Sequence, residues 1–125
     1  MSSPMTNRRW GFIPGTRVVN PHEVERRNRI RLSVAAWAYE NSLRPIMSDQ
    51  AYDELSKLIR PTLATGNPRL DHFFRRHFSP DTGLWIHRHP NQAGLRDIYY
   101  RYYLPTLLTP EERKRARRKA RRKNR

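Results

Sequence analysis

Four side chains between residues 39 and 53 have the types and the spacing of a small ligand site: Tyr39, Asp49, Tyr52 and Asp53. Asp49 and Asp53 are four positions apart, which would place both carboxylates on one face of a helix. Tyr52 adjoins that face, and Tyr39 approaches it across a short turn. Such a corner can hold a planar cation, because aromatic rings stack on it while carboxylates balance its charge and accept its hydrogen bonds.

The same four residues also have a purely structural interpretation. Tyr39 and Tyr52 can simply pack one helix against the next. Asp49 can complement the dipole at a helix start, and Asp53 can be a surface charge. Residue types alone therefore leave open both a ligand site and a packed corner.

The order of these residues resembles the N-terminal Ia domain of NAD-dependent DNA ligases. That domain is a small helical module, and it holds the nicotinamide mononucleotide (NMN) half of NAD while the ligase is adenylated. The family pattern is an aromatic-rich helix end, a proline turn and then Ile-Ser-Asp-x-x-Tyr-Asp-x-Leu. The matching residues here are Tyr39, Pro45, Ile46-Met47-Ser48-Asp49, Tyr52-Asp53 and Leu55. The resemblance implies that Tyr39 stacks on the nicotinamide of NMN or NAD, while the two aspartates and Tyr52 contact its ribose and amide.

The resemblance covers only about residues 24–60, and the sequence departs from the family in three ways. Glu40 stands where the family commonly has a histidine beside the tyrosine, and Pro61 ends the second helix where the family often continues it. No Lys-x-Asp-Gly adenylation motif occurs in the 125 residues. We therefore expect a non-enzymatic protein and not a complete ligase.

The C-terminal segment 113–125 contains ten Lys or Arg residues and no acid. The whole chain has a net charge of +15, so the remainder carries +5. A polyanion is the expected partner, and a merely solubilising tail is the alternative. Nucleic acid fits better than a membrane surface, because the segment's only apolar residues are Ala116 and Ala120, whereas helices that lie on membranes carry Trp, Phe or Leu. The expected phosphate contacts are Arg113, Lys114, Arg115, Arg117, Arg118, Lys119, Arg121, Arg122 and Lys123.

A second basic surface is expected where Arg75, Arg76 and Arg88 alternate with Phe78 and Trp85. Arginine and aromatic side chains together can contact phosphates and stack exposed bases. The four histidines between residues 72 and 89 are interpreted as surface or nucleic-acid contacts. A metal site is not expected there, because the chain has no Cys and no His-Glu-x-x-His pairing on a helix.

Capping residues followed by proline mark most of the expected helix starts. Asn20-Pro21, Asn67-Pro68 and Thr109-Pro110 have this form, and Ser48 can cap a helix after the turn. We expect helices over residues 21–41, 48–60, 67–78 and 91–104, a solvated helix from 110 into the tail, and a short extended piece at 84–90.

Apolar spacing predicts which faces of these helices are buried. In the first helix the core side would be Val24, Ile30, Val34, Trp37 and Ala38, and the opposite side would be Glu25, Arg26, Arg29 and Ser33. Near residue 100, the core would receive Tyr99, Tyr102 and Tyr103, while Tyr100 and Arg101 would be exposed.

These signals predict an all-α protein, a small bundle of four short helices with a basic, partly helical C-terminal tail. An irregular N-terminal arm (1–19) would precede a helical domain (20–108) and the tail (109–125). No apolar run approaches the roughly 18 residues of a membrane span, and no apolar stretch of a signal peptide follows Arg8 and Arg9. A cytoplasmic location is expected.

The predicted function is that of a non-enzymatic, DNA-associated helical protein that resembles a stand-alone ligase Ia module and is anchored by its basic tail. A compact protein of this kind suits a phage genome. One alternative is a module that binds NMN or NAD. Another is an accessory regulator that docks on a host enzyme of DNA replication or repair. A component of a ribonucleoprotein also remains open, since the tail would serve RNA equally well.

Overall fold

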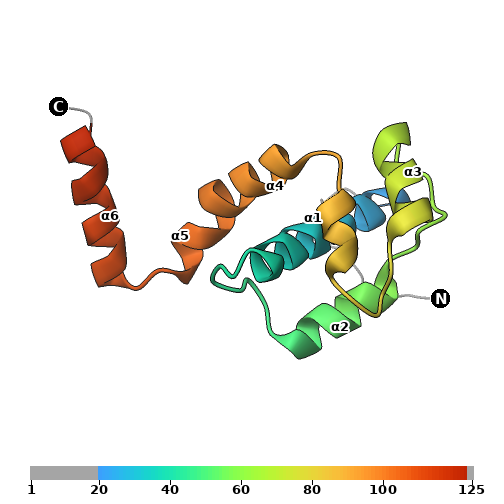
Figure 1. The fold of residues 1–125 in the computed structure, drawn as a ribbon, viewed down its shortest axis with the longest axis horizontal. Helices are drawn as coiled ribbons and strands as arrows, with labels where there is room; N and C mark the ends of the chain where they lie inside the picture. The colour runs from blue at the N-terminus through green and yellow to red at the C-terminus, as the bar shows by residue number, and fades with distance from the viewer. Residues whose placement is uncertain (1–19, 124–125) are drawn as a thin grey trace, which may run out of the picture.

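The computed structural model describes residues 20–123, apart from the side chain of Lys123, so the expected arm 1–19 and the last two residues lie outside the described residues. The fold is all-α, as predicted (Figure 1). Its elements are α1 (Pro21–Glu40), α2 (Asp49–Leu58), α3 (Pro68–His77), the 3-10 helix η1 (Leu84–Arg88), α4 (Gln92–Ile98), the π-helix η2 (Tyr99–Tyr103), α5 (Leu104–Leu107) and α6 (Pro110–Lys123).

The predicted caps are confirmed. Asn20, Ser48 and Asn67 each accept a hydrogen bond from the backbone N–H three residues ahead, at 2.9, 3.1 and 3.2 Å. Thr109 and Glu112 form a complete capping box, in which each side chain accepts from the other residue's N–H, at 3.1 and 2.8 Å. Because these contacts are local, the sequence specifies where four of the helices begin.

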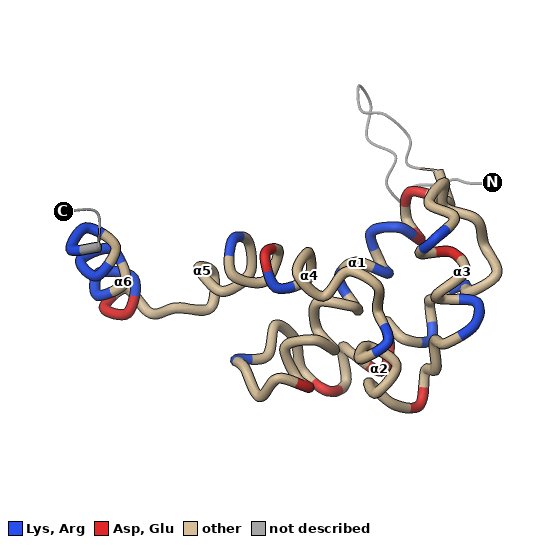
Figure 2. Tube along the Cα trace, turned by 45° about the horizontal axis from the view of Figure 1, so that its top comes forward, with Lys and Arg blue, Asp and Glu red and all other residues tan. Residues whose placement is uncertain are grey.

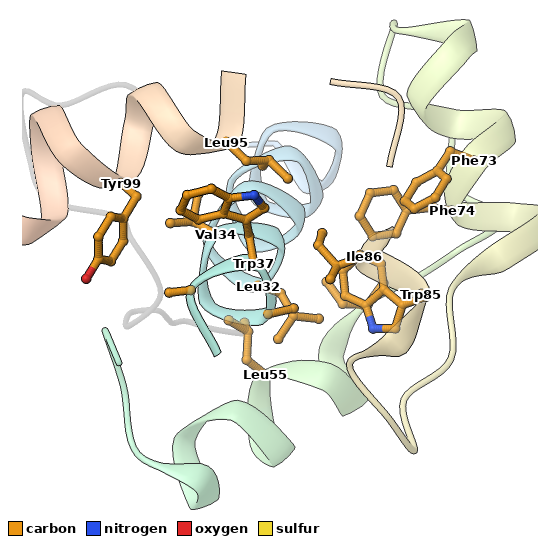
Figure 3. Close-up of a cluster of buried hydrophobic side chains, with 13 residues drawn as sticks. Leu32, Val34, Trp37, Leu55, Phe73, Phe74, Trp85, Ile86, Leu95 and Tyr99 are labelled. Carbon is orange, nitrogen blue, oxygen red and sulfur yellow. The ribbon is translucent and has the colours of Figure 1, made fainter. Parts of the chain in front are cut away.

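Helix α1 runs through the middle of the folded body (Figure 1). Its first half packs on α3, where the Arg29 guanidinium lies 4.9 Å from the centre of the Phe74 ring. Its second half packs on α4 and η2, where the rings of Trp37 and Tyr99 lie 5.8 Å apart (Figure 3). Helix α6 stands apart from this body at one end of the molecule (Figure 1).

The segment expected to be extended at 84–90 is instead helical, and this prediction is wrong. Trp85 and Ile86 are both buried. A strand would point these two neighbours to opposite faces, whereas a single helical turn lets both reach the core. Trp85 joins a cluster with Phe73, Phe74 and Phe78, whose ring centres lie 5.1 to 6.0 Å from that of Trp85 (Figure 3).

The side of α1 expected to face solvent is largely buried, which is a second correction. Glu25, Arg29 and Ser33 are 2%, 4% and 2% exposed, whereas Ile30, expected in the core, is 40% exposed. Arg29 donates to Glu25 at 2.7 Å and to Asp71 at 2.8 Å. It also donates to the backbone carbonyls of residues 60 and 63, both at 2.8 Å. The charge is therefore buried with its partners, as the interior of a protein requires.

The two carboxylates of this network have further donors. Glu25 accepts from the N–H of Arg60 at 2.9 Å, and Asp71 accepts from the N–H and the hydroxyl of Thr65 at 3.0 and 2.6 Å. Burial raises the pKa of Asp71, but the Thr65 hydrogen bonds and Arg29 outweigh it and hold that pKa below its usual value of 3.8. The network thereby joins α1, the connection after α2 and the start of α3.

The helix expected at 91–104 changes from an α-helix to a π-helix at residue 99. This change explains a third correction, which concerns the burial of the tyrosines. Tyr99, Tyr102 and Tyr103 would share one face at α-helical pitch. A π-helical turn holds more residues, because its hydrogen bonds run from i to i+5. As a result Tyr99 is buried and Tyr103 partly buried, but Tyr102 is 63% exposed. The expected exposure of Tyr100 is confirmed.

Buried His89 makes the fold sensitive to acid. Burial and the nearby charge of Arg69 lower the pKa of His89 from 6.5 to about 4. Between these values only the unfolded chain takes up the proton, so stability is lost as the pH falls from about 6.5 to about 4, by up to about 3 kcal/mol. Urea unfolding at pH 7 and pH 4.5 measures this loss. His89→Gln should remove most of it, and an equal loss in that variant would assign the acid sensitivity to other groups.

Candidate functional site

All four residues of the predicted corner line one cavity of about 260 Å³. It lies between the end of α1, the turn at 45–48, the first half of α2 and the loop 80–83. Its walls are Ala35, Ala36, Tyr39, Pro45, Ile46, Met47, Ser48, Asp49, Tyr52, Asp53, Pro80, Asp81, Thr82 and Gly83.

The α1 and α2 sides of the cavity present one accessible ring and two accessible carboxylates. Tyr39 is the penultimate residue of α1, and 69% of it is exposed. Asp49 is the first residue of α2, directly after the Ser48 cap, and Asp53 follows one turn later; both are exposed. A planar ligand can therefore reach the face of Tyr39 while its polar groups meet the carboxylates.

Tyr52 closes the floor of the cavity. Its hydroxyl is buried beside the polar atoms of Ser56 and Trp85, and within the described part of the chain none of the three atoms forms a hydrogen bond of good geometry. Burial raises the pKa of the Tyr52 hydroxyl above its usual value of 10, so it stays protonated and can donate. A buried polar group without a partner costs about 1–3 kcal/mol, which favours any ligand atom or water that reaches it.

The loop 80–83 forms a wall that the sequence pattern did not indicate. Thr82 shapes it by accepting from the N–H of Leu84 at 2.7 Å. Gly83 faces the cavity closely: a methyl group there would lie 3.6 Å from the Tyr52 hydroxyl and 3.7 Å from a carboxylate oxygen of Glu40. Turn chemistry predicts a loop here, but its approach to α2 depends on the burial of η1, for which no local signal exists.

Glu40 stands where the ligase Ia pattern commonly has histidine. Its carboxylate is paired with His87 of η1, with 2.8 Å between Oε1 and Nε2. This contact ties the end of α1 to the segment that follows the loop 80–83. Glu40 therefore supports the wall of the cavity and is not among the residues that line it.

The lining of this cavity is acidic. Asp49, Asp53 and Asp81 contribute three carboxylates, and no Lys or Arg is among the lining residues. Such a site favours a cation and disfavours an anion. A ligand with both charges would place its cationic ring against Tyr39 and its anionic part toward solvent.

The second predicted site is helix α6, whose basic side chains from Arg113 to Arg122 are all exposed. They surround the helix at the end of the molecule farthest from α3 (Figure 2). Arg44 connects the helix to the body, because it donates to the carbonyl of Leu107 at 3.0 Å and pairs with Glu112 at 2.9 Å. The hydrogen bond from Arg44 lowers the pKa of Glu112 to about 2.

The second basic surface differs from its prediction. Arg75, Arg76 and Arg88 are exposed, but Trp85 is 5% exposed and Phe78 is partly buried against it. The rings hold α3 and η1 together, so they are not free to stack on bases. Helix α3 and helix α6 lie at opposite ends of the molecule (Figures 1 and 2), so Arg75 and Arg76 do not extend the surface of α6.

Among residues 20–123, no three His, Asp or Glu side chains gather in a group that could hold a metal ion. No helix in the described part of the chain has the length and apolar character to cross a membrane. Comparison with protein families, with characterised proteins and with solved structures finds no match to this chain. The resemblance to ligase Ia domains therefore depends on the residues between positions 24 and 60 alone.

Proposed function

We propose that this is a non-enzymatic protein associated with nucleic acid, and that α6 anchors it to the phosphates. The observation that carries the proposal is the exposure of every described basic side chain of a helix that stands apart from the body. Charges on all sides of one helix repel each other, and bound phosphates relieve that repulsion. The capping box at Thr109 and the contact to Arg44 hold the start of the helix in place.

DNA is the proposed nucleic acid because the corner of α1 and α2 resembles a module of DNA ligases. The charge of α6 alone does not distinguish DNA from RNA, since both present phosphates. The described residues of α6 offer no Asn or Gln side chain for adenine, and its arginines surround the helix instead of forming one reading face. Binding without sequence preference follows.

Equilibrium binding of a fluorescent 20-base-pair duplex tests the anchor. The full chain should bind DNA duplexes of unrelated sequence equally, and a chain that ends at Leu108 should lose most of the affinity. A matched RNA duplex separates a DNA-associated protein from a ribonucleoprotein component. Equal affinity of the shortened and full-length chains would rule out α6 as the anchor.

A second candidate function is binding of NMN or NAD in the acidic cavity. The supporting observation is that Tyr39, Asp49, Tyr52 and Asp53 line a single cavity. The positively charged nicotinamide ring suits three carboxylates and an exposed tyrosine face. The phosphate does not suit them, so it would point to solvent.

Titration with NMN, followed by NMR, tests this second function. Asp49→Ala should weaken binding about tenfold or more, because it removes a charged hydrogen-bond acceptor. Nicotinamide riboside, which lacks the phosphate, should bind at least as tightly as NMN. Asp97→Ala, an exposed carboxylate outside the cavity, is the control. Unchanged Tyr39 resonances at millimolar NMN would eliminate this function.

A further inference from the structure

A second cavity lies between α1, α3 and α4, and it differs from the acidic one in size and chemistry. Its volume is about 370 Å³, which falls within the range of about 300–1,000 Å³ of small-molecule sites. Its apolar walls are Ile30, Leu70, Phe74, Leu95 and Ile98. No Asp or Glu is among its lining residues, so it does not repel an anion.

Two residues of α1 give this cavity polar ends. Ser33 is 2% exposed, and its hydroxyl has no hydrogen-bond partner. Arg26 is exposed and uses one nitrogen to donate to the carbonyl of Thr65, and it forms no ion pair with an acid among residues 20–123. Seven residues separate the two positions, so their Cα atoms lie about 10 Å apart along the helix.

The charge of the other arginine in the lining is already satisfied. Arg29 pairs with Glu25 and Asp71 and donates to two carbonyls. His89 also lines the cavity, and its Nδ1 accepts from the N–H of Asn91 at 3.0 Å. The neutral ring therefore carries its proton on Nε2, which is a donor and not a base. The lining thus offers donors and one positive charge.

We propose that this cavity binds a small aromatic carboxylate with a polar group at the far end of its ring. The ring packs between Ile30, Leu95 and Phe74. The carboxylate meets Arg26 at the open end, and the distal hydroxyl or carbonyl meets Ser33. The length of a hydroxyphenyl acid with a two-carbon chain is close to the distance of about 10 Å between the Cα atoms of these two residues. This site is independent of nucleic-acid binding and of the acidic cavity.

Three related probes test the assignment on the full chain by NMR: 3-(4-hydroxyphenyl)propionate, 3-phenylpropionate and the amide of the first. The first should bind best and shift the resonances of Ile30, Ser33 and Leu95. In Ser33→Ala the roughly fivefold advantage of the hydroxylated acid over 3-phenylpropionate should disappear. In Arg26→Gln the advantage of the acid over its amide should disappear.

Two further variants make the test specific. Ile30→Trp, at a half-exposed position, should fill the cavity and abolish binding of all three probes without disturbing the core. Asp53→Ala, in the acidic cavity, should change nothing. Probe preferences that persist in Ser33→Ala and Arg26→Gln would overturn the proposal.

Discussion

Replacing Arg29 by methionine is expected to lower the free energy of unfolding by about 3–5 kcal/mol, the cost of leaving buried charges without a partner. Glu25 and Asp71, which are 2% and 8% exposed, would lose their cationic partner. The carbonyls of residues 60 and 63 would lose their donor as well. Because a domain of this size is stable by only about 5–15 kcal/mol, the loss amounts to between about a fifth and the whole of its stability.

Urea unfolding followed by circular dichroism measures this loss, and neighbouring positions supply the controls. Arg31→Met changes an exposed arginine on the same helix and should stay within about 0.5 kcal/mol of the original chain. The loss of stability in Arg29→Lys should lie between the losses in Arg29→Met and Arg31→Met, because one ammonium group cannot form the four contacts of the guanidinium. A loss in Arg29→Met no larger than that in Arg31→Met would show that the buried network does not stabilise the fold.

The second large effect is expected in the salt dependence of nucleic-acid binding. If six or more of the basic residues of α6 contact phosphates, affinity should fall about a thousandfold or more between 50 and 200 mM salt. Fluorescence anisotropy across this range gives the slope of log affinity against log salt. Replacing Arg117, Arg118, Arg121 and Arg122 by glutamine should reduce that slope by about 3 to 4.

A matched double variant distinguishes the contribution of α6 to nucleic-acid binding from that of α3. Arg75→Gln with Arg76→Gln removes two exposed charges at the opposite end of the molecule. This variant should change the slope by less than 1, because α3 lies at the opposite end of the molecule from α6. A larger change would mean that α3 contributes an additional nucleic-acid contact.

The sequence predicted helix starts because the determinants of a helix start are local. Asn20, Ser48, Asn67 and Thr109 each bond to a backbone group three residues away. The corner was predictable for a related reason. Tyr39 and Asp49 belong to consecutive helices joined by a short turn, so few arrangements of the two are open to the chain.

The errors arose where contacts span long separations. Glu25 and Arg29 have the composition of a solvent-exposed face. Apart from each other, their partners are 31 to 42 residues away, and no periodicity in the sequence indicates such distant partners. The loop 80–83 reaches the cavity because Trp85 and Ile86 are buried beyond it. Tyr102 was misplaced because a π-helical turn altered the helical phase, and the sequence of five consecutive residues gives no sign of that change.

The separation of acidic cavity and basic helix gives the molecule a large electric dipole moment. Asp49, Asp53 and Asp81 lie around α2 and the loop 80–83, while the positive charge is concentrated on α6 at one end (Figure 2). In the electric field of a polyanion, such a molecule rotates before contact, so α6 meets the polyanion first. The three carboxylates around the acidic cavity repel a polyanion at the same time, which strengthens this orientation.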